Sequence, residues 1–168
     1  MGPLEGLLTT WSRALQTFGQ GVPAAGSQFS DSAVLPELKA QVESAAPGDQ
    51  WLGGAATAYA AANDEHALVV GKLADLDTRL AAEVDKSAGV VASGRVELDK
   101  VREWVLSAAS SVPDNQAGQM MLMSIVSTGL GQLSAIVSMA NGELNAIGAQ
   151  IQQVGEEYAA LSQQKFAV

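Results

Sequence analysis

The stretch that decides the fold is MSIVSTGLGQLSAIVSMANGELNAIGAQIQQVGEEYAAL, residues 123–161. Its apolar residues recur at alternating steps of three and four: Met123, Val126, Leu130, Leu133, Val137, Ala140, Leu144, Ile147, Ile151, Val154, Tyr158 and Leu161. This spacing places them along one side of an α-helix, as in helices that pack as coiled coils. The stretch therefore predicts a long helix over about 118–165.

The preceding segment carries the same alternation, interrupted where successive steps of four lead to Val84 and Ala88. Its apolar positions are Tyr59, Ala62, His66, Val69, Leu73, Leu76, Leu80, Val84, Ala88, Val91, Gly94, Leu98, Val101, Val105, Ala108 and Val112. They predict a second long helix over about 54–112, followed by the breaker Pro113-Asp114-Asn115. Because two long helices joined by a short turn lie antiparallel, we expect a helical hairpin.

Two shorter helices are predicted before the hairpin. Apolar residues from Leu4 to Phe18 share one helical face, and a loop is expected over 19–30. Ser30, Asp31 or Ser32 then caps a helix that continues to Ala46 and is stopped by Pro47-Gly48-Asp49. We predict an all-α fold: an elongated antiparallel helical hairpin, about 54–112 and 118–165, with two shorter N-terminal helices packed along it as one domain over 1–168.

The composition excludes several classes of function. The chain has no Cys, one His and nine Lys and Arg residues, with a net charge of −9. Disulfides, thiolate chemistry and His-rich metal sites are therefore excluded. Nucleic acid binding is disfavoured because it needs clustered Lys and Arg side chains. We expect no catalytic residue, no cofactor and no metal. The N-terminus also lacks the charged and apolar regions of a conventional export signal.

The titratable residues in the long helices are expected to have structural roles. The regularly spaced apolar positions of each long helix form its seam, and His66 is one of these positions. Because no second His or Cys can join it, we expect His66 to be buried or half-buried by packing. Asp75 with Arg79, and Arg95 with Asp99, stand four residues apart and are expected on a solvated helix face.

The turn before the first long helix carries the most specific motif. The run PGDQWLGGAATAYAAANDEH spans residues 47–66 and is followed by LADLDTRL at 73–80. Over roughly residues 34–112 the chain resembles the EspA/EspE family of mycobacterial type VII (ESX) secretion-associated proteins, which is related to the WXG superfamily of helical hairpins. The resemblance implies a secreted or cell-surface, virulence-associated protein, exported through the ESX machinery or its chaperone without a cleaved signal peptide.

One departure from that family concerns its second export motif, Tyr-x-x-x-Asp/Glu. Here Tyr59 is followed four residues later by Asn63, and Tyr158 by Ser162. The resemblance then implies that an EspC-like, co-secreted helical partner supplies the motif. In that hypothesis the export and partner-binding motif of this chain consists of the W-x-G turn and Tyr59. The turn is made by Trp51, Leu52 and Gly53.

Residues 115–142 carry no charge, and 119–140 are long enough to span a bilayer. A second apolar row lies beside the seam and consists of Leu122, Ile125, Ile136 and Met139. The first short helix, a partner or a second copy would cover this row. We expect a partner-binding surface at the hairpin tip, made by Met120, Met121, Leu122 and Ile125. The alternative is a stand-alone structural or adaptor protein that forms homo-oligomers or contacts a membrane through 119–140.

Overall fold

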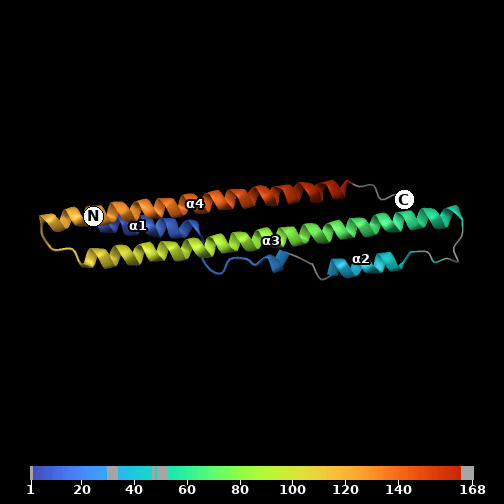
Figure 1. Cartoon of the computed structure of the whole chain (residues 1–168), viewed down its shortest axis with the longest axis horizontal. Coiled ribbons are helices and arrows are strands. Elements are labelled where there is room, and N and C mark those ends of the chain that lie inside the picture. The colour runs from blue at the N-terminus through green and yellow to red at the C-terminus, as the bar shows by residue number, and fades with distance from the viewer. Residues whose placement is uncertain (1, 30–33, 47, 49–52, 164–168) are drawn as a thin grey trace. The chain divides into compact units, whose positions relative to one another are not determined.

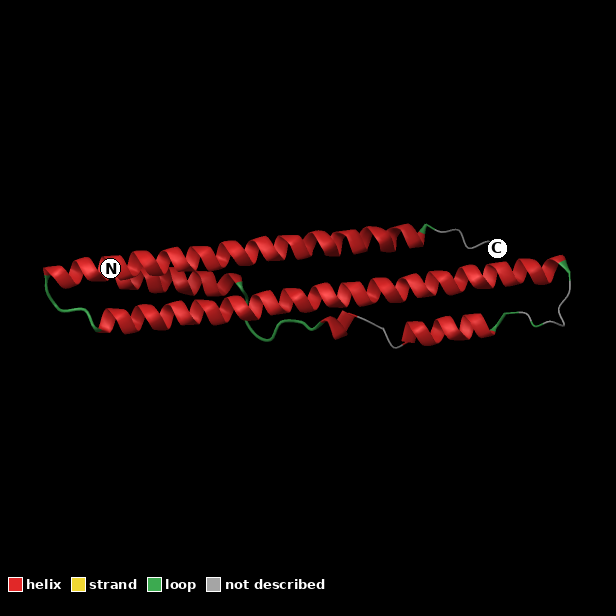
Figure 2. Cartoon of the chain, viewed as in Figure 1, coloured by secondary structure: helices red, strands yellow, loops and turns green. Residues whose placement is uncertain are grey.

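The computed structural model describes residues 2–29, 34–46, 48 and 53–163, and every structural statement below concerns these residues. Figures 1 and 2 show helices joined by loops, and the described residues contain no strand. The elements are α1 (Pro3–Thr17), the short 3₁₀ helix η1 (Gly26–Phe29), α2 (Val34–Ser44), α3 (Gly54–Ser110) and α4 (Gln116–Ser162). The predicted all-α class and both long helices are confirmed.

The helix ends follow local chemistry. Pro3 opens α1, where its missing N–H costs nothing, and the Glu5 carboxylate accepts the Gly2 backbone N–H at 3.1 Å. The Asn115 side chain accepts the Gly118 backbone N–H at 2.8 Å and so caps α4. The predicted caps of α2, residues 30–32, lie outside the described residues.

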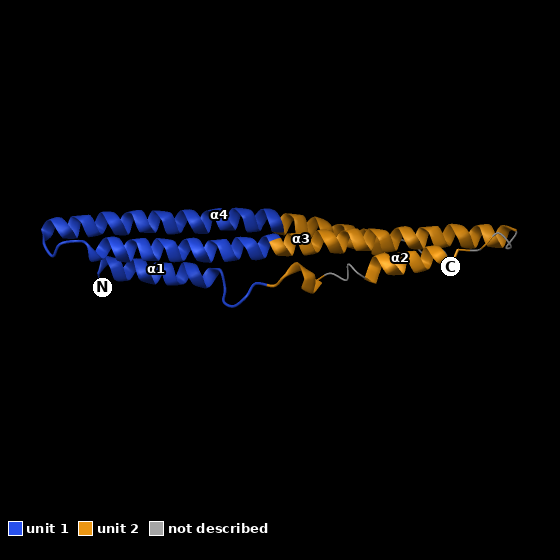
Figure 3. Ribbon diagram, turned by 60° about the horizontal axis from the view of Figure 1, so that its bottom comes forward, with its two compact units in different colours: residues 1–23, 86–147 blue, residues 24–85, 148–168 orange. Residues whose placement is uncertain are grey.

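The chain divides into two compact units, coloured separately in Figure 3. Unit 1 comprises Met1–Pro23 and Lys86–Ile147, and unit 2 comprises Ala24–Asp85 and Gly148–Val168. In each unit a stretch of α3 packs antiparallel against a stretch of α4, with one short N-terminal helix beside them. The predicted antiparallel packing of the two long helices, with a shorter N-terminal helix beside them, is thus confirmed within each unit, whereas a single domain over 1–168 stays a prediction.

In unit 1, α1 is inserted deeply between the long helices. Leu7 is 1% exposed and packs in one core cluster with Leu98 and Val105 of α3 and with Val126 and Leu133 of α4. A Cβ placed on Gly129 would lie 2.7 Å from both the Leu7 Cδ1 and the Val105 Cγ2 atoms. A glycine is therefore required here because the Leu7 side chain occupies the space.

Polar contacts fix α1 in the same unit. The Trp11 indole N–H donates to the Leu98 carbonyl at 2.8 Å, and the Arg102 guanidinium lies 5.2 Å from the centroid of the Trp11 ring. Arg95 donates to the carbonyls of Phe18, at 2.9 Å, and Gly21, at 2.5 Å. The expectation that Arg95 lies with Asp99 on a solvated face is wrong, because the free carbonyls at the C-terminus of α1 attract its guanidinium.

In unit 2 the core is smaller. Leu76 of α3 packs with Val154 and Leu161 of α4, flanked by partly buried Leu73, Leu80 and Tyr158. The 19–30 segment, expected to be a loop, includes η1, whose Gly26 backbone N–H donates to the Asp85 carboxylate at 2.6 Å. Helix α2 buries no residue, and the aliphatic stem of its Lys39 lies 3.4 Å from a Cβ built on Gly71.

The α4 seam has the predicted register over most of its length, but Met123 and Leu130, which were predicted in the seam, are 56% and 38% exposed. Within the seam, one residue in every seven is buried: Val126, Leu133, Ala140, Ile147, Val154 and Leu161. On α3 the register is confirmed from Val69 onward, but two of the three positions predicted before it are wrong, and the third, Ala62, is half-buried. Tyr59 and His66 are exposed, while Ala56, Asn63 and Ala67 are buried. The reason is that Leu161, one residue before the end of α4, packs beside Leu73 and Leu76, so α4 cannot set the register of the preceding turns.

Candidate functional site

The structure describes the predicted export motif only in part. Trp51 and Leu52 lie outside the described residues. Gly53 has a φ of +113°, a backbone conformation that L side chains rarely adopt, and nothing lies within 4 Å of a Cβ built on it. Tyr59 is 51% exposed, one and a half turns into α3. The described part of this motif is therefore a glycine selected for its backbone angle and an exposed aromatic ring.

The predicted surface at the tip separates into two pairs of residues. Met120 and Met121 are 72% and 52% exposed, respectively. Leu122 and Ile125 are half-buried and pack against the core cluster of unit 1. Of the four residues, only the two methionines are exposed to an incoming partner, and the other two support the helix from within unit 1.

Helix α4 combines a packed seam with an apolar surface. It is long and apolar enough to cross a membrane by length and composition, and most of that apolar window is not buried inside the structure. Its exposed apolar residues include Met120, Met121, Met123 and Met139. The same helix contributes six buried seam residues, from Val126 to Leu161, so it also meets the requirements of a helix that packs in a bundle.

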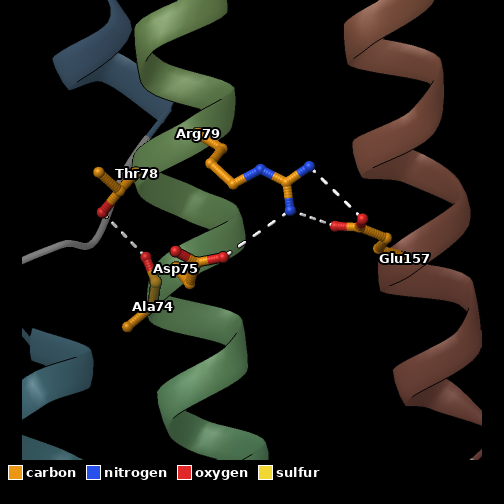
Figure 4. A network of polar contacts seen from close by, with 5 residues as sticks. All are labelled: Ala74, Asp75, Thr78, Arg79 and Glu157. Atoms are coloured by element: carbon orange, nitrogen blue, oxygen red, sulfur yellow. Dashed lines mark hydrogen bonds and ion pairs between the residues drawn. The ribbon is translucent and has the colours of Figure 1, made fainter.

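Unit 2 joins α3 to α4 by a polar network, shown in Figure 4. The Arg79 guanidinium reaches from α3 to the Glu157 carboxylate on α4, where its Nη2 lies 3.4 Å from Oε1 and its Nη1 bonds Oε2. The predicted pair with Asp75 also forms, at 3.7 Å. Arg79 thus bridges an acid on its own helix and an acid on the neighbouring one.

A second contact in unit 2 joins the same two helices. The Tyr158 hydroxyl on α4 donates to the Asp77 carboxylate on α3. Burial of the ring, together with the hydrogen bond to Asp77, raises the pKa of Tyr158. Tyr158 was expected only as a seam residue, and the structure adds that its hydroxyl binds an acid supplied by the other helix.

The described residues do not form a catalytic constellation. His66 is exposed, so the expectation that it packs in a buried or half-buried seam is wrong, and the described part of the chain contains no group of three His, Cys, Asp or Glu residues that could hold a metal. A hollow of about 700 Å³ lies between α1 and α4, but Arg13 is the single charged residue among those that line it. General acid–base chemistry needs convergent titratable groups, which this hollow does not supply.

Sequence reasoning missed the residues that fasten α1 to the hairpin. Gly94 was assigned to the seam, and a Cβ there would lie 2.3 Å from the Phe18 ring. The lack of a side chain at Gly94 therefore leaves room for the Phe18 ring at the end of α1. Gly129 admits Leu7 in the same way. The available signal was the position of these glycines inside otherwise regular helices, where glycine is costly unless it permits a close approach.

Comparison with known proteins gives a partial match. Residues 18–100 match the model of the EspA/EspE family. The protein named ESX-1 secretion-associated protein EspA, from two strains of Mycobacterium tuberculosis, is 33% identical to the chain over 86 residues. That alignment covers 51% of this chain and 22% of the relative, so the chain spans about a fifth of the length of the relatives it matches. No solved structure matches the chain.

Proposed function

The chain belongs to the EspA/EspE family through residues 18–100, and on that premise we propose that it is an ESX (type VII) secretion-associated protein that acts by helix–helix association. The observation that carries the proposal is the family match, which overlaps the 34–112 stretch containing the W-x-G turn. The relative is named an ESX-1 secretion-associated protein, which supports the same process. The matching family is not a catalytic one, which supports binding as the activity.

The partner that we propose is an EspC-like co-secreted helical protein. This chain lacks Tyr-x-x-x-Asp/Glu after Tyr59 and after Tyr158, so the partner would supply that motif and this chain the W-x-G turn. Exposed Tyr59 and the positive φ of Gly53 support a turn that presents a defined surface. Export to the cell surface or medium would then need both chains.

Co-expression tests this proposal directly. The chain is produced with the product of an adjacent EspC-like reading frame, and the mass of the complex is measured by size-exclusion chromatography with light scattering. We expect a one-to-one complex that is lost on Trp51→Ala and weakened by Gly53→Ala. Gly54→Ala is the matched control, because nothing lies within 4 Å of a Cβ there and its φ is ordinary. Normal export from a strain lacking any EspC-like gene contradicts the proposal.

A stand-alone structural or adaptor protein is the second candidate, and the apolar exposed surface of α4 favours it. In this function the chain oligomerises or binds a membrane through 119–140. Flotation with phospholipid vesicles distinguishes the two candidates. Recovery of the folded chain with the lipid, reduced by Met120→Lys with Met121→Lys, supports the second candidate and argues against the first.

A further inference from the structure

Within unit 1, a hollow lies between α1 and the stretch of α4 beside it (Figure 1). Its volume of about 700 Å³ falls within the range of about 300–1,000 Å³ found for small-molecule sites. The residues at its base are apolar: Leu133 is 2% exposed, and Val137 and Ala14 are half-buried. Leu130 is 38% exposed and adds an apolar side chain that an incoming molecule can reach. The hollow therefore offers a short apolar surface.

The walls of the hollow are polar. On α1, the hydroxyls of Thr10 and Thr17 donate to carbonyls of their own helix, at 3.0 and 2.6 Å. On α4, four polar residues follow one another at steps of four, three and four, which places them on one side of the helix: Ser134, Ser138, Asn141 and Asn145. Their side chains have no hydrogen-bond partner within the described part of the chain. These hydroxyl and amide groups are therefore available to a ligand.

Arg13 supplies the charge of the hollow. It is the single charged residue among those that line it, and its side chain has no ion pair or hydrogen bond among the described residues. Other cations are engaged: Lys39 and Lys100 pair with Glu side chains, and Arg95 binds backbone carbonyls. The planar guanidinium of Arg presents several N–H donors to a carboxylate or a phosphate. An anionic group is therefore the complement of this wall.

The acids nearest to Arg13 along the two helices do not occupy the hollow. Glu5 lies more than two turns earlier on α1, and its carboxylate accepts the Gly2 backbone N–H. Glu143 on α4 lines a different hollow, which it shares with Lys86 of α3. Unit 1 as a whole contains six acidic and five basic residues, so most of the net charge of −9 lies outside it. An anion beside Arg13 therefore meets no acid among the lining residues.

We propose that this hollow binds a small anionic amphiphile, whose charged head group pairs with Arg13 and whose apolar part lies on Leu130, Leu133 and Val137. The polar row of α4 supplies further hydrogen bonds to the head group. A partner helix fits less well, because it needs apolar anchors over several turns, whereas the α4 residues that line the hollow beyond Val137 are polar or glycine. The site goes beyond the proposed function, which assigns no role to this hollow.

A titration with a simple amphiphile tests the site. The probe is sodium decanoate, kept below the concentration at which it forms micelles, and amide shifts of the full chain are followed by NMR. We expect shifts confined to residues 10–17 and 130–145, saturating at one decanoate per chain. Two controls divide the ligand into its parts. Decyltrimethylammonium has the same alkyl chain with the opposite charge, and acetate has the charge without the chain. Each should bind here at least about tenfold more weakly.

Two matched pairs of variants locate the binding. Arg13→Gln should weaken binding of decanoate about three- to tenfold, whereas Lys72→Gln, the same loss of charge in unit 2, should leave it unchanged. Leu130→Gln should weaken binding about threefold or more, because it removes part of the apolar surface. Leu68→Gln is its control, since Leu68 is 61% exposed and lies in unit 2. Leu130 lies outside the core cluster of unit 1, so this variant should fold, and circular dichroism checks all four.

The proposal is wrong if decyltrimethylammonium shifts the same amides as strongly as decanoate, or if Arg13→Gln binds decanoate like the unmodified chain. It is also wrong if a Glu-rich amphipathic peptide produces the shifts and decanoate does not, since the hollow would then receive a protein partner. The titration uses the chain alone. Its failure therefore disproves the amphiphile site and leaves the proposed ESX association standing, whereas loss of the co-expressed complex has no bearing on decanoate binding.

Discussion

The two short N-terminal helices are held in different ways. In unit 1, Leu7 of α1 is 1% exposed, and Phe18, the C-cap of α1, is 8% exposed. In unit 2, α2 buries no residue, and its Val34 and Leu38 remain 58% and 42% exposed. One helix is part of a core, whereas the other lies on the surface of its unit.

The long helices beneath them explain this difference. Under α1, Gly94 and Gly129 leave space that Phe18 and Leu7 fill, so large apolar side chains enter between α3 and α4. Under α2, the contact at Gly71 is made by the stem of Lys39, whose charged end stays near solvent. The depth at which a short helix docks is thus determined as much by glycines on the receiving helices as by its own apolar face.

The largest expected effect comes from truncating the deepest side chain. Leu7→Ala removes a fully buried side chain and leaves a cavity, so the free energy of unfolding of unit 1 should fall by about 2–5 kcal/mol. Leu38→Ala, the matched change in α2, should cost less than about 1 kcal/mol because Leu38 is 42% exposed. Hydrogen exchange of the α1 and α2 amides measures each loss locally. Equal losses in the two helices contradict the comparison.

The next effect comes from adding a methyl group beneath each short helix. Gly94→Ala forces the Phe18 ring to move and should destabilise unit 1 by about 1–3 kcal/mol. Gly71→Ala meets only the flexible Lys39 stem, at 3.4 Å, so the better helix propensity of Ala should make it neutral or stabilising by up to about 1 kcal/mol.

Gly131→Ala is the reference for both glycine substitutions, because nothing lies within 4 Å of a Cβ there and it measures the propensity gain alone. Urea unfolding followed by circular dichroism compares the three variants. If Gly94→Ala were as stable as Gly131→Ala, the space at Gly94 would not be what admits α1.

The same comparison explains what the sequence could predict. Regular apolar spacing predicted the helices and the α4 register from Val126 to Leu161, because a helix repeats its environment every seven residues along a constant neighbour. It failed at Tyr59 and His66, where the neighbour changes because α4 has ended. Periodicity within one helix contains no information about where its partner stops.

Contacts between distant segments were also beyond the sequence. Arg95 and Asp99 had the spacing of a surface pair, but Arg95 lies beside the C-terminus of α1, and its guanidinium binds carbonyls there. The tip residues show a similar limit, since Met121 and Leu122 are adjacent apolar residues that differ in exposure because only one faces the core. Trp51 and Leu52, the central residues of the proposed export motif, lie outside the described residues.

A smaller effect tests the polar contacts that supplement the thin core of unit 2. Tyr158→Phe removes a hydrogen bond to a carboxylate at a half-buried site and should cost about 1 kcal/mol near neutral pH. The raised pKa of Tyr158 makes this contribution pH-dependent. Above about pH 10 the unfolded chain ionises this phenol while the folded chain still retains its proton, so the stability of the unmodified chain falls as pH rises.

The advantage of the unmodified chain over Tyr158→Phe should therefore shrink above about pH 10. Urea unfolding at several pH values measures it. In a Tyr59→Phe background Tyr158 is the single phenol, since the chain has two Tyr residues, and phenolate absorbance then reports its titration alone. Titration at the ordinary pKa of Tyr would show that Asp77 and burial do not hold the proton.

The smallest effect is expected from two arginines, one within each unit, whose guanidinium groups contact a neighbouring helix at a site open to solvent. Arg79→Gln in unit 2 removes the bridge to Glu157 and Asp75, and its cost in free energy of unfolding should be lower than that of Tyr158→Phe because water and salt screen a half-exposed ion pair.

Arg102→Gln in unit 1 removes a guanidinium stacked on the Trp11 ring. The cost of Arg79→Gln should decrease with added salt, whereas that of Arg102→Gln should change less, because part of the stacking contact is apolar. A double-mutant cycle of Arg79→Gln with Glu157→Gln isolates the bridge, and a coupling that does not decrease with salt would show that packing, rather than charge, joins α3 to α4 at that point.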